Sequence, residues 1–169
     1  MNTNNIKSFA QQARLLLLEG VRQRLMYWGF DAKGNNSETL ETTHGGYIFR
    51  GEIHTDSTVP EKWNALRKKI TDKQSVNDVI EEAAYTWFNR LMAIKILEEN
   101  QYLDPTLQFA EGVHTPMLVQ NAKQGNHTIT STTNRNLLID LLKENQEEQA
   151  FALLITNLCN KNKLLHDVF

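Results

Sequence analysis

The chain has 169 residues but only one cysteine and three prolines, and its apolar runs are short. A single cysteine cannot form an internal disulfide, and Cys159 lies in the apolar stretch 151–159, where a buried thiol is expected. The opening MNTNNIKSFAQQAR lacks the charged-then-apolar plan of a signal peptide, and no apolar run is long enough to span a bilayer. We therefore expect a reducing, cytoplasmic setting and no membrane contact.

Net charge is also small. Eighteen Lys and Arg residues stand against 20 Asp and Glu, a formal net charge of -2, so the chain as a whole does not attract nucleic acid. Hydrophobic residues make up 40% of the sequence and charged residues 22%, which is typical of a protein that folds. The length suits one hydrophobic core, and we predict a single domain over residues 1–169.

The usual catalytic and metal-binding signatures are missing. The sequence has no Walker loop, no G-x-G-x-x-G, no H-E-x-x-H, no G-x-S-x-G and no paired-cysteine zinc spacing. His44 and His54 could face each other across a hairpin, but two histidines without a third ligand make a weak zinc site, and solvated hairpin residues are the favoured interpretation. Cys159 has no nearby histidine or basic cluster to activate it. We predict no catalytic residue, no metal and no cofactor in this chain.

Apolar residues at helical spacing predict most of the secondary structure. A long first helix runs through Phe9, Ala10 and Leu16 to Trp28, and Gly29 ends it. Further helices are predicted at about 60–71, 75–99, 134–142 and 147–166, with a long loop and one short helix at 106–133. Ser75 is expected to cap the helix 75–99, with Asp78 completing a short variant of the capping box.

The stretch 38–55 changes period. Two runs rich in threonine and aromatic residues flank Gly45-Gly46, which predicts a two-stranded antiparallel hairpin packed on helices. The predicted fold class is therefore mainly α: a multi-helix, bundle-like domain with a small antiparallel β-hairpin near 38–55.

The predicted helix 60–71 concentrates positive charge beside Trp63. Lys62 and Lys69 are one heptad apart on a helix, and Arg67 and Lys68 lie on the flanks of the same face. A face of this kind can follow nucleic-acid phosphates, so these four residues are candidate nucleic-acid contacts. A solvated helix face with no ligand is the favoured alternative.

The stretch EAAYTWFNRLMAIKILEENQY, residues 82–102, is apolar on almost every side of the predicted helix. At about 100° per residue, one narrow polar stripe remains, formed by Glu82, Thr86, Asn89 and Arg90. A helix of this kind is normally central and buried, so we expect its aromatic residues in the core and favour a structural stripe over a partner or ligand site. Steps of four residues would allow a link from the Glu82 carboxylate through the Thr86 hydroxyl to the Arg90 guanidinium.

Two segments carry a resemblance to a known family. MNTNNIKSFAQQAR, residues 1–14, and AAYTWFNRLMAIKILEENQYL, residues 83–103, resemble the start of the PglX family in order and approximate separation. Members of this family are large adenine-specific DNA methyltransferases of BREX phage-defence systems. The resemblance is dense in these two segments, loose between them and faint after Leu103.

The resemblance implies a parent protein that uses S-adenosylmethionine, methylates DNA and works beside other defence-system proteins. In the family, the glycine-rich cofactor motif and the catalytic N-P-P-Y motif lie downstream, and neither occurs here: none of Pro60, Pro105 and Pro116 adjoins an asparagine or another proline. No catalytic residue can be carried over. We expect a non-catalytic N-terminal domain from a longer chain, in a bracing, partner-contact or DNA-backbone role, with DNA contact the least favoured. The alternative is a stand-alone helical interaction or adaptor protein.

Overall fold

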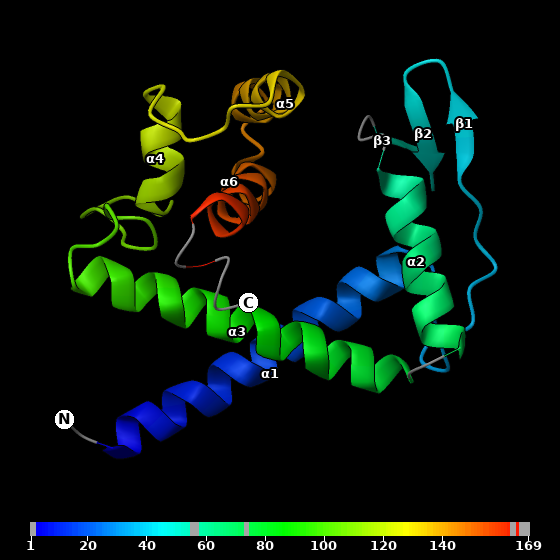
Figure 1. Ribbon diagram of the computed structural model, residues 1–169, viewed down its shortest axis with the longest axis horizontal. Helices are drawn as coiled ribbons and strands as arrows, with labels where there is room; N and C mark the ends of the chain where they lie inside the picture. Colours follow the sequence, from blue (N-terminus) through cyan, green and yellow to red (C-terminus); the bar gives the residue numbers. More distant parts are fainter. Residues whose placement is uncertain (1–2, 55–57, 73–74, 163–164, 166–169) are drawn as a thin grey trace. The chain divides into compact units, whose positions relative to one another are not determined.

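The computed structural model describes all residues except 1–2, 55–57, 73–74, 163–164 and 166–169 (Figure 1). Within the described residues the chain is mainly helical with one small antiparallel sheet, which confirms the predicted fold class. The elements are α1 (Thr3–Tyr27), β1 (Glu41–Thr43), β2 (Gly46–Phe49), β3 (Glu52–His54), α2 (Val59–Asp72), α3 (Val76–Glu99), α4 (Met117–Lys123), α5 (Thr132–Lys143) and α6 (Glu147–Lys161). They group into two compact units, Met1–Phe88 and Asn89–Phe169. The single domain over 1–169 stays a prediction.

The sheet of the first unit is larger than the predicted hairpin. β1 pairs with β2 through a two-residue turn, and β2 pairs with a third strand, β3, so the order is β1-β2-β3. The second turn consists of Arg50 and Gly51, whose φ angles of 50° and 83° are both positive, as a type I′ hairpin turn requires. Arginine is uncommon at such a φ, and for this reason the sequence did not predict the turn.

The Arg50 side chain is held in this strained turn by several contacts. Its guanidinium bonds the Glu38 carboxylate, with a shortest distance of 2.6 Å, and donates to the Met26 carbonyl at 3.1 Å. It also lies 5.6 Å from the centroid of the Phe49 ring. The turn is thereby tied to the end of α1.

The core of the first unit is formed where α1, β2, α2 and the start of α3 meet. Phe49 of β2 is fully buried, and Trp63 of α2 is 6% exposed. The Trp63 indole Nε1 donates to the Trp28 carbonyl oxygen at 3.0 Å, so its one polar group is satisfied. Complete burial of a phenylalanine side chain such as Phe49 contributes roughly 1.5–3 kcal/mol to the stability of the fold.

The predicted capping box at the start of α3 is confirmed. The Ser75 hydroxyl donates to Asp78 Oδ2 at 2.7 Å and accepts from the Asp78 backbone N–H at 3.2 Å, and Asp78 Oδ2 accepts from the Ser75 backbone N–H at 3.1 Å. These bonds, chiefly the one from the Ser75 hydroxyl, lower the pKa of the Asp78 carboxyl below its ordinary value.

The expectation that the aromatic residues of α3 lie in the core is wrong for Tyr85. The buried side chains of α3 are Val76, Val79, Ile80, Ala84, Ile94 and Glu98, which lie on either side of positions 85–93. Tyr85 is 69% exposed, and Trp87 and Phe88 are half-buried. An apolar surface in a sequence shows that a helix can be central, but not that other elements cover it.

The second unit is built around α6, which packs against both α4 and α5 (Figure 1). Its core includes Val119, Leu138 and Leu154, all 2% exposed or less. Cys159 is buried in α6, as predicted. The predicted short helix within 106–133 is α4, and the predicted end of the last helix at 166 lies outside the described residues.

The loop that follows α3 is organised by a buried carboxylate. Glu98 is 5% exposed, and its Oε1 accepts the backbone N–H groups of Thr106 and Leu107, the latter at 2.6 Å. Lys95 Nζ lies 3.7 Å from the other carboxylate oxygen. The buried negative charge therefore has hydrogen-bond donors and a nearby cation to offset its desolvation.

The capping box gives a direct test of local stability. We expect Ser75→Ala to lower the free energy of unfolding by about 1 kcal/mol, because the Asp78 backbone N–H at the start of α3 loses its acceptor. Ser131→Ala is the matched control, since Ser131 is the N-cap of α5 but makes no side-chain capping bond. Urea unfolding followed by circular dichroism measures both variants, and an equal loss in the two would contradict the assignment.

Candidate functional site

One of the four candidate cations on α2 forms an ion pair with a residue of α3. Lys62, Arg67 and Lys68 are exposed, as a nucleic-acid contact requires. Lys69 is half-buried, and its Nζ lies 2.8 Å from the nearer carboxylate oxygen of Glu82 on α3. Lys69 and Glu82, which the sequence placed in different candidate sites, therefore form an ion pair. The Glu82 carboxylate partly neutralises Lys69, so Lys69 would attract a phosphate less strongly.

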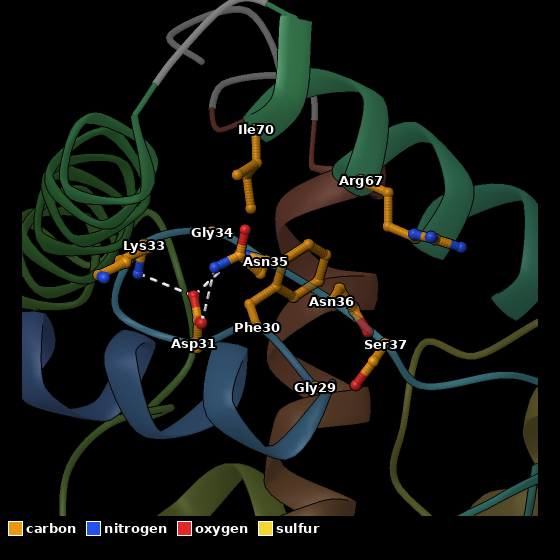
Figure 2. A pocket seen from close by; sticks show the side chains of 10 residues that line it. All are labelled: Gly29, Phe30, Asp31, Lys33, Gly34, Asn35, Asn36, Ser37, Arg67 and Ile70. Atoms are coloured by element: carbon orange, nitrogen blue, oxygen red, sulfur yellow. Dashed lines mark hydrogen bonds between the residues drawn. The ribbon is translucent and has the colours of Figure 1, made fainter.

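A polar pocket of about 600 Å³ lies beside this face, between α2 and the loop that follows α1 (Figure 2). Its lining includes Asp31, Lys33 and Asn35 from the loop, and Arg67 and Ile70 from α2. In Figure 2 the Arg67 side chain and the Asp31 end of the loop lie at opposite sides of the pocket. The pocket therefore presents charges of both signs, with Arg67 on one side and Asp31 and Lys33 on the other.

Asp31 orders the loop that forms this pocket. Its carboxylate accepts the backbone N–H groups of Lys33 and Asn35 and the Asn35 side-chain amide, at 2.8–2.9 Å. Hydrogen bonds from Asn35, first through its side chain and then through its backbone, lower the pKa of the Asp31 carboxyl. The bonds give Asp31 a structural role in the loop.

The predicted link along the polar stripe of α3 is not formed through Thr86. The Thr86 hydroxyl donates to the backbone carbonyl of Glu82 at 2.8 Å, and the Glu82 carboxylate bonds Lys69. Glu82 and Thr86 belong to the first unit, whereas Asn89 and Arg90 belong to the second and are half-buried. The role of the stripe as a partner site or a structural element stays a prediction.

Arg90 is electrostatically coupled to Cys159 of α6. Burial raises the pKa of the Cys159 thiol, and the positive charge of Arg90 opposes this only in part. A thiol with a raised pKa is a poor nucleophile at neutral pH.

Aromatic and polar side chains form a cluster at the end of α1 that the sequence did not predict. The rings of Trp28 and Phe49 lie 5.0 Å apart between centroids, and the His54 ring lies 5.1 Å from Trp28. The Tyr27 hydroxyl donates to the Glu52 carboxylate and lies 3.2 Å from His54 Nε2. Glu52 and His54 reach this cluster through the pairing of β3 with β2, which the sequence did not predict, so no local sequence signal marked them.

The two hairpin histidines are far from equivalent. His44 is exposed in the turn between β1 and β2, as predicted, but His54 is half-buried in β3, opposite Tyr47. Across the described ranges, no group of three or more His, Cys, Asp or Glu side chains is placed to hold a metal ion.

An apolar groove lies between α1 and α3 in the first unit. It has a volume of about 310 Å³ and is lined by Ala10, Arg14, Glu81, Ala84, Tyr85 and Phe88. Arg14 and Glu81 neutralise each other, with both carboxylate oxygens 2.7 Å from Arg14 Nη2. Phe9 and Leu16 of α1, one heptad apart, are 56% and 75% exposed although the sequence predicted them on the apolar face of the first helix.

Comparison with known proteins places the chain in context. It is 30% identical over 166 residues to the adenine-specific methyltransferase BrxX of Escherichia coli O9:H4 (strain HS), a match that covers 95% of this chain. It is 32% identical over 111 residues to the adenine-specific methyltransferase PglX of Lacticaseibacillus casei (strain Zhang), covering 61% of this chain. The chain is related to the BrxX and PglX adenine-specific methyltransferases. The resemblance to the PglX family seen in the sequence is thereby confirmed.

The relationship to BrxX extends well past Leu103, where the resemblance in the sequence had faded. The chain spans only 14% of the length of BrxX and 9% of the length of PglX. No protein-family model and no solved structure matches it. None of the described helices is both long enough and apolar enough to cross a membrane.

The ion pair between Lys69 and Glu82 leads to a prediction about DNA binding. We expect the BrxX-related chain to bind duplex DNA weakly, with part of the salt dependence carried by the exposed Lys68. Changing Lys68 to alanine should flatten the slope of log K against log salt by about one, whereas Lys69→Ala should leave it unchanged because Lys69 is paired with Glu82. Fluorescence anisotropy over a salt series measures both, and tight binding that depends on Lys69 would contradict the structure.

The aromatic cluster makes a prediction about pH. Burial, together with the hydrogen bond and the charge of Glu52, raises the pKa of Tyr27 from 10.0 to about 12. Because the neutral phenol is favoured in the folded state, its contribution to stability is complete below pH 10 and is lost as pH rises towards 12. Tyr27→Phe should remove the highest-pH step from the tyrosinate absorbance titration. Tyr102→Phe, at a position that is 74% exposed, is the control and should retain that step.

Proposed function

We propose that the chain is a non-catalytic part of a BREX-type adenine-specific DNA methyltransferase and that it braces the rest of the protein or contacts a protein partner. The relationship to BrxX and PglX supports the parent activity. The small share of each relative that the chain spans supports a role as one part of a longer protein, as expected of an N-terminal domain.

The observation that carries the proposal is the exposure of the apolar side chains Phe9 and Leu16 on one side of α1. The α1–α3 groove, which Ala10 and Arg14 line on another side of this helix, adds a second apolar surface. Large exposed apolar patches on folded proteins usually mark a contact with another protein surface. The groove offers Tyr85 and Phe88 as apolar walls, and its two charged residues, Arg14 and Glu81, are already paired. A surface that is apolar and electrically neutral suits protein better than the phosphate backbone of DNA.

DNA-backbone contact is the second candidate, and the exposed residues Lys62, Arg67 and Lys68 favour it. It ranks below protein contact, because the net charge of -2 offers no general attraction and Lys69 is committed to Glu82.

The parent protein would use S-adenosylmethionine as the methyl donor. The described residues of this chain do not fit that cofactor, because their one sheet is antiparallel and no glycine-rich loop leads from a strand into a helix. We assign no residue of this chain to the cofactor and no step of methyl transfer to it.

Co-purification tests the proposal. The tagged chain is expressed with a version of the Escherichia coli BrxX relative that lacks the matching 166-residue region. We expect the chain and this truncated protein to co-purify in a one-to-one molar ratio. Leu16→Glu should reduce binding at least tenfold, because a charge would be buried in an apolar contact.

Gln11→Glu is the matched control, since it adds the same charge to an exposed position on the opposite side of α1. Equal loss of binding in both variants would point to a fault other than the apolar face. Failure of the unaltered chain to bind at all would favour the alternative, a stand-alone interaction or adaptor protein.

A further inference from the structure

The second unit has a separate surface that the proposed function does not use. A shallow depression of about 580 Å³ lies along α5, the end of α4 and the loop between these helices. Three cationic residues, Lys123, Arg135 and Lys143, contribute to its lining, and no carboxylate does. The depression is therefore a local positive region on a chain whose overall charge is slightly negative.

Two of these three cations are not neutralised within the described part of the chain. Lys123 forms an ion pair with Glu147. Arg135 instead donates to a neutral group, the Ile129 carbonyl oxygen, at 3.3 Å, and Lys143 is exposed without an ion pair to any described residue. Asp140 and Glu144 are close in sequence but do not line the depression. Arg135 and Lys143 are the charges available to a ligand.

An exposed apolar side chain lies between these two charges. Arg135, Ile139 and Lys143 follow one another in steps of four, so they form one stripe along α5. Ile139 is 41% exposed, and the adjacent positions Leu138 and Leu142 provide an aliphatic floor. At the rise of an α-helix, the backbone positions of the two cations are about 12 Å apart.

We propose that this stripe is a docking site for an acidic amphipathic protein segment. An apolar side chain of the partner would pack on Ile139 and Leu142, and carboxylates on either side of it would meet Arg135 and Lys143. A helix with acidic, apolar and acidic residues at steps of four has this spacing. A nucleic acid fits less well, because the depression has no Phe, Tyr or Trp on which a base could stack.

The test uses the 169-residue chain and a designed peptide. The probe is a fluorescein-labelled helical peptide with Glu, Leu and Glu at steps of four in an alanine and glutamine background. In fluorescence anisotropy we expect Lys143→Glu to weaken binding about fivefold or more, through loss of attraction and added repulsion. Ile139→Gln should weaken it by a similar factor, through loss of apolar contact.

Matched controls lie outside the depression. Lys7→Glu makes the same charge change on α1, and Ile96→Gln makes the same apolar-to-polar change at another exposed isoleucine, which is 57% exposed. Both should leave peptide affinity unchanged. Circular dichroism checks that each variant keeps its helical content.

A charge exchange gives the decisive result. A second peptide, with Lys in place of both Glu residues, should bind the Arg135→Glu, Lys143→Glu double variant more tightly than it binds the unaltered chain. The proposal is overturned if the acidic peptide does not bind, if Lys143→Glu and Ile139→Gln leave its affinity unchanged, or if duplex DNA displaces it from the same residues. These outcomes do not depend on truncated BrxX, so they are separate from the test of the proposed function.

Discussion

The hydrogen bond from the Trp63 indole to the Trp28 carbonyl fixes the place where three elements of the first unit meet. It joins α2 to the end of α1, and Phe49 of β2 packs against both indole rings. Three arginines are laid over the outside of this cluster: Arg24 over Tyr27 and Trp28, Arg50 over Phe49, and Arg67 over Trp63. The aromatic core therefore also decides where part of the positive charge of this unit is displayed.

Features set by neighbouring residues were the ones the sequence predicted well. The Ser75 and Asp78 capping box is complete within one helical turn, so the local sequence contains all its partners. The third strand was missed because its turn places Arg50, and not an asparagine or glycine, in the left-handed region. That conformation is held by Glu38 and Met26, which lie 12 and 24 positions away in the chain.

The candidate sites depended more heavily on tertiary contacts. Helical periodicity identified Phe9, Leu16 and Tyr85 as residues of largely apolar faces, but an exposed face and a covered one have the same pattern in sequence. In the same way, four cations on one helix looked equivalent until Glu82 was found beside Lys69. The family resemblance was visible from two short segments because it needs only identity and order, and no knowledge of packing.

The buried carboxylate of Glu98 has a consequence for how this chain can change during evolution. It holds the backbone N–H groups of Thr106 and Leu107, and not their side chains. Many residue types could therefore replace either of them at little cost to this contact, whereas proline, which has no N–H, could not. Insertions and deletions between Glu98 and Thr106 would shift the donors away from the carboxylate, so this loop should tolerate changes of composition more readily than changes of length.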